Sequence, residues 1–92
     1  MAKFLMLGNY SAQAIKGITA GRTKKVAEVI KKSGGRVSLM YALLGAYDLV
    51  FLVEFPGIKE ALKASVTLAK LTGISFISLP AITVEEFDRM VS

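Results

Sequence analysis

The chain has no cysteine, no histidine and no tryptophan among its 92 residues. Without cysteine no disulfide can form, and without cysteine and histidine the usual zinc ligands are missing. A serine–histidine–aspartate triad, a thiol nucleophile and a histidine-ligated haem are excluded for the same reason. The seven acidic residues are scattered along the chain. We therefore expect no metal site and no cofactor.

Phosphate-binding motifs and membrane segments are missing as well. Neither a GxxxxGK[ST] loop nor a GxGxxG loop occurs. The longest apolar stretch, residues 41–53, contains Gly45 and Asp48 and is too short to cross a bilayer. The first residues have no apolar signal-peptide core, so we expect a cytoplasmic protein without a membrane partner.

The length and the apolar content predict one domain, residues 1–92, that needs an additional source of stability. A chain of this size buries only roughly 60–65% of its unfolded surface. Small domains compensate with disulfides, metals or oligomerisation, and only the last is open here. Since 53% of the residues are hydrophobic, we expect a homo-oligomer, either a dimer or a multiple of dimers.

Cap and turn signals divide the chain into alternating strands and helices. Glycines 17 and 21 predict a loose turn over residues 11–18 before the first helix, and Gly45-Ala46 predicts a short hairpin. The predicted strands are residues 3–10, 36–44, 47–55 and 74–81, and the predicted helices are 19–33, 58–72 and a short one to about residue 91. This βαββαβ order is the ferredoxin-like α+β arrangement, in which two helices cover one face of a four-stranded antiparallel sheet.

Both faces of the predicted sheet are apolar. In the third strand Leu49 and Phe51 lie on one face, and Val50 and Leu52 lie on the other. In the second strand simple alternation puts one set of residues on a shared face: Val37, Leu39, Tyr41 and Leu43. Each large side chain left in water forgoes ~1.5–3 kcal/mol. We therefore predict that the sheet packs against a second copy, with Leu49 and Phe51 in the interface.

The segment Gly45-Ala46-Tyr47-Asp48 is the most informative one. Gly45 is expected to supply the positive φ angle that the turn needs. A carboxylate inside an otherwise buried run requires a partner. Asp48 therefore either caps the turn by accepting hydrogen bonds from backbone N–H groups or lines a ligand pocket together with Tyr47.

This Gly-x-Tyr-Asp hairpin, followed by an aliphatic strand and Pro56, resembles the signature of the GYD domain family. The resemblance extends over nearly the whole chain, at Tyr10-Ser11, Gly17-Ile18, Arg22, Gly34-Gly35 and Tyr41. It implies a ferredoxin-like dimeric α+β barrel whose role is not established. The acid that the family prefers after the proline is replaced by Gly57, a poorer helix cap.

A similar hairpin occurs in the effector-binding domains of leucine-responsive-type regulators, where it lies near an amino-acid site between subunits. This chain has no helix-turn-helix segment, so it resembles only the effector module.

Four further polar residues are candidates for ligand binding: Asn9, Tyr10, Arg22 and Tyr41. Tyrosine is stable when half-buried, so core packing is the competing interpretation. Arg22 lies at the start of a helix, where the helix dipole disfavours a cation. This position indicates a partner such as Asp48 or a ligand anion, although a solvated arginine fits as well. Together with Gly45, Tyr47 and Asp48 these are the candidate ligand-binding residues, and no residue is assigned a catalytic role.

Seven of the twelve basic residues lie between Lys16 and Arg36. The RNA-recognition motif shares the βαββαβ order, but its third strand presents aromatic rings for base stacking. Residues 48–54 are mostly aliphatic here, so we do not expect nucleic acid as a partner, and a solvated helix face explains the lysines.

These observations lead to the hypothesis of a non-catalytic homo-oligomeric module that binds a small ligand near the hairpin. One alternative is a cofactor-independent monooxygenase or isomerase of the dimeric α+β barrel class, in which Asp48, a tyrosine or water would transfer the proton. A structural subunit is the third possibility.

Overall fold

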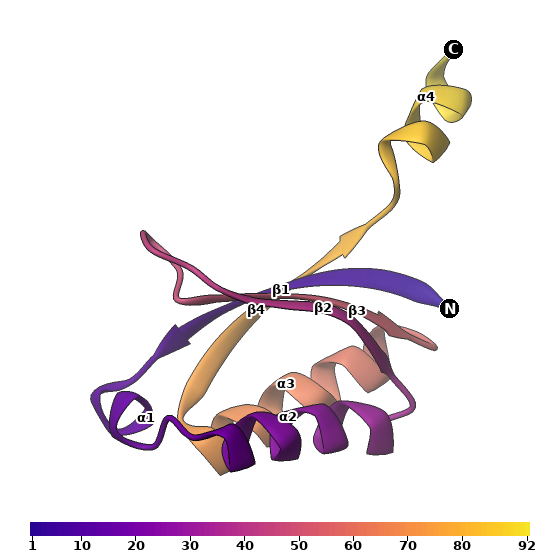
Figure 1. The fold of residues 1–92 in the computed structure, drawn as a ribbon. Helices are drawn as coiled ribbons and strands as arrows, with labels where there is room; N and C mark the ends of the chain where they lie inside the picture. Colours follow the sequence, from indigo (N-terminus) through magenta and orange to yellow (C-terminus); the bar gives the residue numbers. More distant parts are fainter.

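The computed structural model describes residues 1–92 and places the long helices on one face of a four-stranded antiparallel sheet (Figure 1). The elements in chain order are β1 (Ala2–Tyr10), α1 (Ala12–Lys16), α2 (Ala20–Lys32), β2 (Arg36–Ala42), β3 (Leu49–Phe55), α3 (Ile58–Thr72), β4 (Ile74–Ala81) and α4 (Val84–Val91). The strands are ordered β2-β3-β1-β4. The ferredoxin-like α+β prediction is therefore confirmed.

Side-chain caps and glycines set the helix boundaries. Ser11, Thr19 and Thr83 each accept a hydrogen bond from the backbone N–H three residues later, which starts α1, α2 and α4. At the other end, α3 stops at Gly73, whose φ of +76° is left-handed. The predicted bounds of α3 and β4 are confirmed, whereas the predicted loose turn over residues 11–18 contains the short helix α1.

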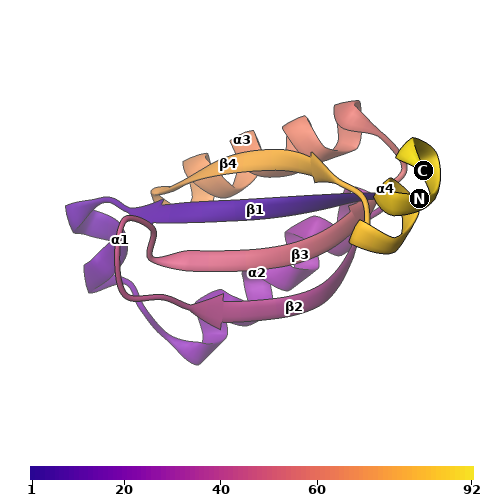
Figure 2. The same ribbon diagram turned by 90° about the horizontal axis from the view of Figure 1, so that it is seen from above.

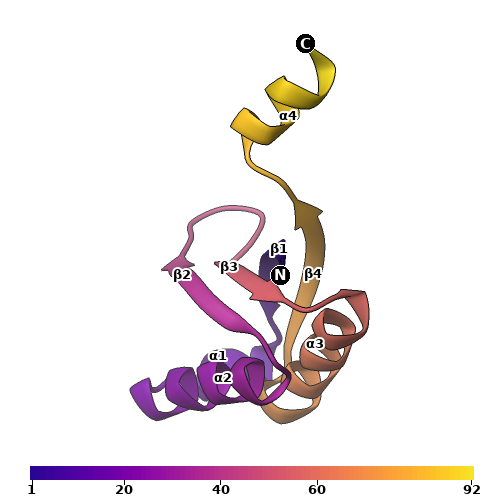
Figure 3. The same ribbon diagram turned by 90° about the vertical axis from the view of Figure 1, so that its right-hand side faces the viewer.

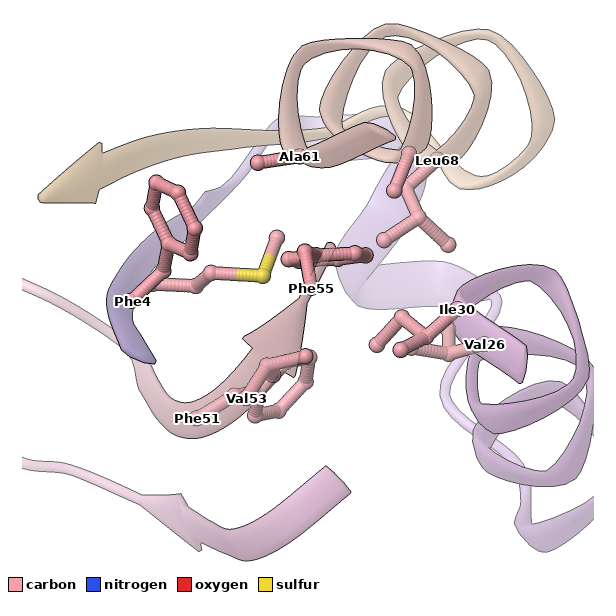
Figure 4. Close-up of a cluster of buried hydrophobic side chains, with 10 residues drawn as sticks. Phe4, Val26, Ile30, Phe51, Val53, Phe55, Ala61 and Leu68 are labelled. Atoms are coloured by element: carbon pink, nitrogen blue, oxygen red, sulfur yellow. The ribbon is translucent and has the colours of Figure 1, made fainter. Parts of the chain in front are cut away.

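The core lies between the sheet and the two long helices (Figure 4). The sheet contributes Phe4, Met6, Phe51, Val53 and Phe55, and the helices contribute Val26, Ile30, Ala61, Ala64 and Leu68. The rings of Phe4 and Phe55 meet edge to face, with their centroids 5.8 Å apart. This core uses only one face of the sheet.

A β-bulge changes the predicted faces of β2. Val37 pairs with Val53 and Leu39 pairs with Leu52, so Ser38 is an extra residue without a partner in β3. Val37 consequently faces the helices, whereas Leu39 and Tyr41 face the opposite side. The prediction that Val37, Leu39 and Tyr41 share one face is wrong for this reason.

Two further expectations about the hairpin and the interface are corrected. The strands β2 and β3 are joined by a loop of residues 43–48, not by a two-residue turn, because β2 ends at Ala42 and β3 begins at Leu49. The expected interface residue Phe51 is only 3% exposed and packs under the helices. Leu49 also packs against that core.

Figure 2 looks onto the face of the sheet opposite the helices, here called the open face. This face carries two complete apolar rows. Strand pairing aligns four leucines across the sheet, the leucine row: Leu39, Leu52, Leu5 and Leu79. The neighbouring row consists of Tyr41, Val50, Leu7 and Ile77. Four of these eight side chains, Leu39, Tyr41, Ile77 and Leu79, are between 44% and 59% exposed.

A charged row borders the apolar rows at one end of the open face. Glu54 pairs in register with Lys3 on β1 and with Arg36 on β2. The hydrogen bond from Arg36 lowers the pKa of Glu54 below its ordinary value of 4.5, helped by the charges of Arg36 and Lys3 and opposed by desolvation. A lowered pKa stabilises the fold above the unfolded-state pKa, and this contribution is lost as the pH falls through the folded-state pKa.

Glu54→Gln should therefore make unfolding less dependent on acid pH. We expect the wild-type protein to lose more of its free energy of unfolding than the variant when the pH falls from 7 to about 3.5. Urea denaturation at both pH values measures this difference, and Glu28→Gln on the exposed side of α2 is the control. An unchanged pH dependence in Glu54→Gln would contradict the assignment.

Two glycines make a matched pair for testing the helix boundaries. A Cβ atom at Gly73 would lie 2.9 Å from Ser11 Oγ in a left-handed backbone, so Gly73→Ala should lower the free energy of unfolding by about 1–2 kcal/mol. Gly21 lies in the first turn of α2 with no atom closer than 3.8 Å to such a Cβ. Gly21→Ala should raise the free energy of unfolding by about 0.4–1 kcal/mol.

Chemical denaturation of both variants measures these changes in the free energy of unfolding. A change of the same sign in both variants would refute the roles assigned to the two glycines.

Candidate functional site

Backbone hydrogen bonds fasten the loop of residues 43–48 to the end of β1. The Asp48 N–H donates to the Gly8 carbonyl at 2.8 Å, and the Leu43 N–H donates to the Asp48 carbonyl at 2.8 Å. The Asp48 carboxylate accepts a hydrogen bond from the Tyr10 N–H at 2.9 Å between Oδ2 and N. Asp48 thus caps backbone groups, as the first of its two predicted roles required, although its partner lies on β1 and not in the turn.

Gly45 adopts the positive φ predicted for it. Its φ is +143°, and a Cβ at this position would meet no other atom within 4 Å. The requirement for glycine is therefore conformational and does not come from crowding.

Arg22 has a protein partner, but this partner is not Asp48. The Arg22 guanidinium donates to the carbonyl of Ala14, and its Cζ lies 5.6 Å from the centroid of the Tyr10 ring, within the range of a cation–π contact. The one ion pair in the structure joins Arg36 to Glu54. The expectation of an Arg22–Asp48 pair is wrong because Asp48 is engaged with the backbone of β1 and Arg22 reaches back to α1.

A groove of about 240 Å³ lies between α2 and β2 and reaches the end of β1. Its lining consists of Tyr10, Ile18, Arg22, Thr23, Val26, Met40, Tyr41, Ala42, Leu49, Phe51 and Ile74. We call it the α2–β2 groove. It brings together three of the seven candidate residues, Tyr10, Arg22 and Tyr41. The other four, Asn9, Gly45, Tyr47 and Asp48, lie outside its lining.

Sequence reasoning missed the apolar part of the groove. Met40 lines it because the bulge at Ser38 shifts the alternation of β2, and the sequence carries no signal for that bulge. Ile18 follows the short helix α1 and is 54% exposed. The sequence gives only one sign that Ile18 lines the groove, namely that it is a single apolar residue between the cap residues Gly17 and Thr19.

The groove combines an apolar lining with a few polar groups at one place. The polar and charged residues of the lining are Arg22, Thr23, Tyr10 and Tyr41. This arrangement suits a ligand with an apolar body and an anionic or hydrogen-bonding head. Elsewhere, no three acidic side chains lie close enough together to hold a metal ion, and no helix has the length and hydropathy needed to cross a membrane.

Comparison with known proteins gives one match. The family model of the GYD domain matches residues 4–91, which is nearly the whole chain. No curated protein and no solved structure matches. The match includes the loop with Gly45, Tyr47 and Asp48, which the hydrogen bonds of Asp48 hold against β1. The chain therefore belongs to the GYD domain family.

Proposed function

We propose that the protein is a non-catalytic module that works as a homodimer and binds a small apolar anion in the α2–β2 groove. The dimer follows from the open face, the single observation that carries the proposal. Antiparallel sheets expose one face to water when that face is polar. Here two adjacent rows of large apolar side chains cross all four strands, four of them are about half exposed, and complete burial of such a side chain contributes ~1.5–3 kcal/mol.

A second copy of the chain is the cover that matches this face. Two sheets pack with their side chains interdigitated at a separation of about 10 Å. A two-fold axis brings the same rows of both copies together, so that each copy contributes the same apolar surface to the interface. The charged row of Lys3, Glu54 and Arg36 lies at the rim, where water still reaches it.

Arg22 supports the anionic ligand. A guanidinium has five N–H donors, and the carbonyl of Ala14 uses one nitrogen of Arg22. The ring of Tyr10 holds the group in place, so its remaining donors are preorganised for a carboxylate. The apolar lining takes the hydrocarbon part, and a volume of about 240 Å³ limits the ligand to a small molecule.

The lining of the groove also favours binding over catalysis. Proton transfer near neutral pH is most efficient with a histidine, a shifted carboxylate or a lysine. The polar and charged residues of the groove lining are two tyrosines, one threonine and one arginine. The lining contains no carboxylate, and that of Asp48 accepts the Tyr10 N–H and lies outside the lining.

Replacing Leu52 in the centre of the open face tests the dimer. Leu52→Asp should convert a dimer into 9.9 kDa monomers, because an unpaired carboxylate in a dry interface costs several kcal/mol. Sedimentation at micromolar concentration measures the mass, and circular dichroism checks that the variant is folded. Thr67→Asp, on the exposed side of α3, is the control and should remain dimeric. A wild-type protein that sediments only as a monomer would refute the proposal.

Thermal-shift screening against amino acids and small aromatic carboxylic acids tests the groove. A binder raises the melting temperature by mass action, and calorimetry then gives its affinity. Arg22→Gln should weaken that affinity by about 1.5–3 kcal/mol, the contribution of a charge-assisted hydrogen bond. Lys24→Gln, on the exposed side of α2, should leave it unchanged.

Asp48→Asn separates the groove from the loop in the same assay. The amide oxygen can still accept the Tyr10 N–H, so the fold and the affinity should both survive. If the affinity falls in Asp48→Asn and not in Arg22→Gln, the ligand binds at the Gly-x-Tyr-Asp loop instead. Turnover of any ligand found would contradict the non-catalytic role.

A further inference from the structure

Helix α4 projects away from the rest of the molecule (Figures 1 and 3), and none of its residues is buried. Thr83 caps it by accepting a hydrogen bond from the Glu86 N–H at 3.1 Å. The spacing of its apolar residues gathers them on one side of the helix. They are Val84, Phe87, Met90 and Val91, which are between 52% and 73% exposed. We call residues 82–91 the arm.

An isolated helix of this length is marginal in water, because packing of its apolar side supplies most of its stability. None of the residues of α4 is buried in the single chain. The arm therefore has a well-defined start and an apolar stripe, but it lacks a surface to pack on.

We propose that the arm docks on a second copy of this chain and clasps the dimer formed through the open face. The inference rests on the proposed dimer and adds a second, separate contact to it. Each copy donates its arm to the other, as a two-fold axis requires.

The direction of the arm supports docking on another copy. Only Ile82 and Thr83 separate the end of β4 from the start of α4, and two residues span at most about 7 Å. The arm rises on the side of the open face, away from α2 and α3 (Figure 3). A second sheet stacked at about 10 Å would lie on that same side, within reach of a helix about 12 Å long.

The area of the open face supports it as well. Four strands about 4.8 Å apart and three rows of residues about 6.8 Å apart, two apolar and one charged, give a face of about 390 Å² per copy. Stable dimers bury about 600–1,000 Å² per partner. One side of α4 covers about 120 Å², so one arm donated and one arm received add about 240 Å² and bring the total to about 630 Å², inside that range.

The same estimate argues against an arm that folds back over its own sheet. One helix would cover about 120 Å² of a face of about 390 Å². More than half of the area of the two apolar rows would then stay in water, whereas a second copy covers the face and the arm together.

Charge favours the same partner. The arm carries Glu85, Glu86 and Asp88 against Arg89, whereas the rest of the chain holds eleven of the twelve basic residues and four of the seven acids. An acidic arm is attracted to the basic body of a second copy, and this attraction weakens as salt increases.

Truncating the apolar stripe tests the inference. The double variant Phe87→Ala, Met90→Ala should raise the dimer dissociation constant at least tenfold, measured by sedimentation over a concentration series. Arg89→Ala, on the opposite side of the same helix, should leave it unchanged or lower it. A wild-type dimer whose dissociation constant is the same in the double variant would overturn the arm contact and leave the open-face dimer standing. A monomeric wild-type protein would overturn both.

Cross-linking identifies the surface on which the arm packs. Since the chain has no cysteine, Asp88→Cys introduces a single thiol at the border of the apolar stripe for a photoreactive cross-linker. Unlabelled and ¹⁵N-labelled protein are mixed, allowed to exchange and irradiated, and the cross-linked peptides are analysed by mass. We expect mixed pairs of light and heavy peptides. Cross-links that join the arm only to its own chain would refute the proposal.

Discussion

The constraint on which the rest of this structure depends is a sheet that is apolar on both faces and covered on only one. Helices α2 and α3 close one face over the core of Phe4, Phe51 and Phe55. The opposite face keeps the leucine row and its neighbour in partial contact with water. A domain of 92 residues is only marginally stable, so an uncovered face of this kind affects the whole molecule. The proposed homodimer would cover the open face, and the proposed docking of the arm would add to that cover.

The family's Gly-x-Tyr-Asp segment does not line the groove but contacts a residue that does. Asp48 fixes the backbone of Tyr10 through the hydrogen bond from its N–H. The ring of Tyr10 in turn lies against the guanidinium of Arg22, which is held by the carbonyl of Ala14. The loop thus orients a groove that it does not line, and Asp48 is a positioning residue for the proposed site.

The elements defined by local signals were predictable from the sequence. Helix α3 begins after Pro56-Gly57 and ends at Gly73, and strand β4 follows at once, because glycine in the left-handed conformation ends a helix by itself. The capping residue Thr83 defines α4 in the same way. Local geometry decides these boundaries, so the sequence carries the information directly.

The features set by pairing between distant segments were not predictable. The bulge at Ser38 exists because β2 must match its register to β3, and this bulge alone moves Leu39 and Tyr41 to the open face. The partner of Arg22 depends on how α1 folds back toward α2. The same holds for the groove, whose lining comes from separate parts of the chain. Of its polar residues, the sequence identified Tyr10, Arg22 and Tyr41 by type, but it could not bring them together.

Tyr41 connects the two parts of the proposed function. It belongs to the second apolar row of the open face and also lines the α2–β2 groove. In the single chain it is 59% exposed. In the proposed dimer a second copy would cover its side chain on the open face, while the same residue borders the groove. A ligand in the groove and a second copy on the open face would therefore contact the same residue of β2, which gives a physical route for coupling between them. By linkage, a ligand that binds better to the dimer strengthens the dimer by the same factor.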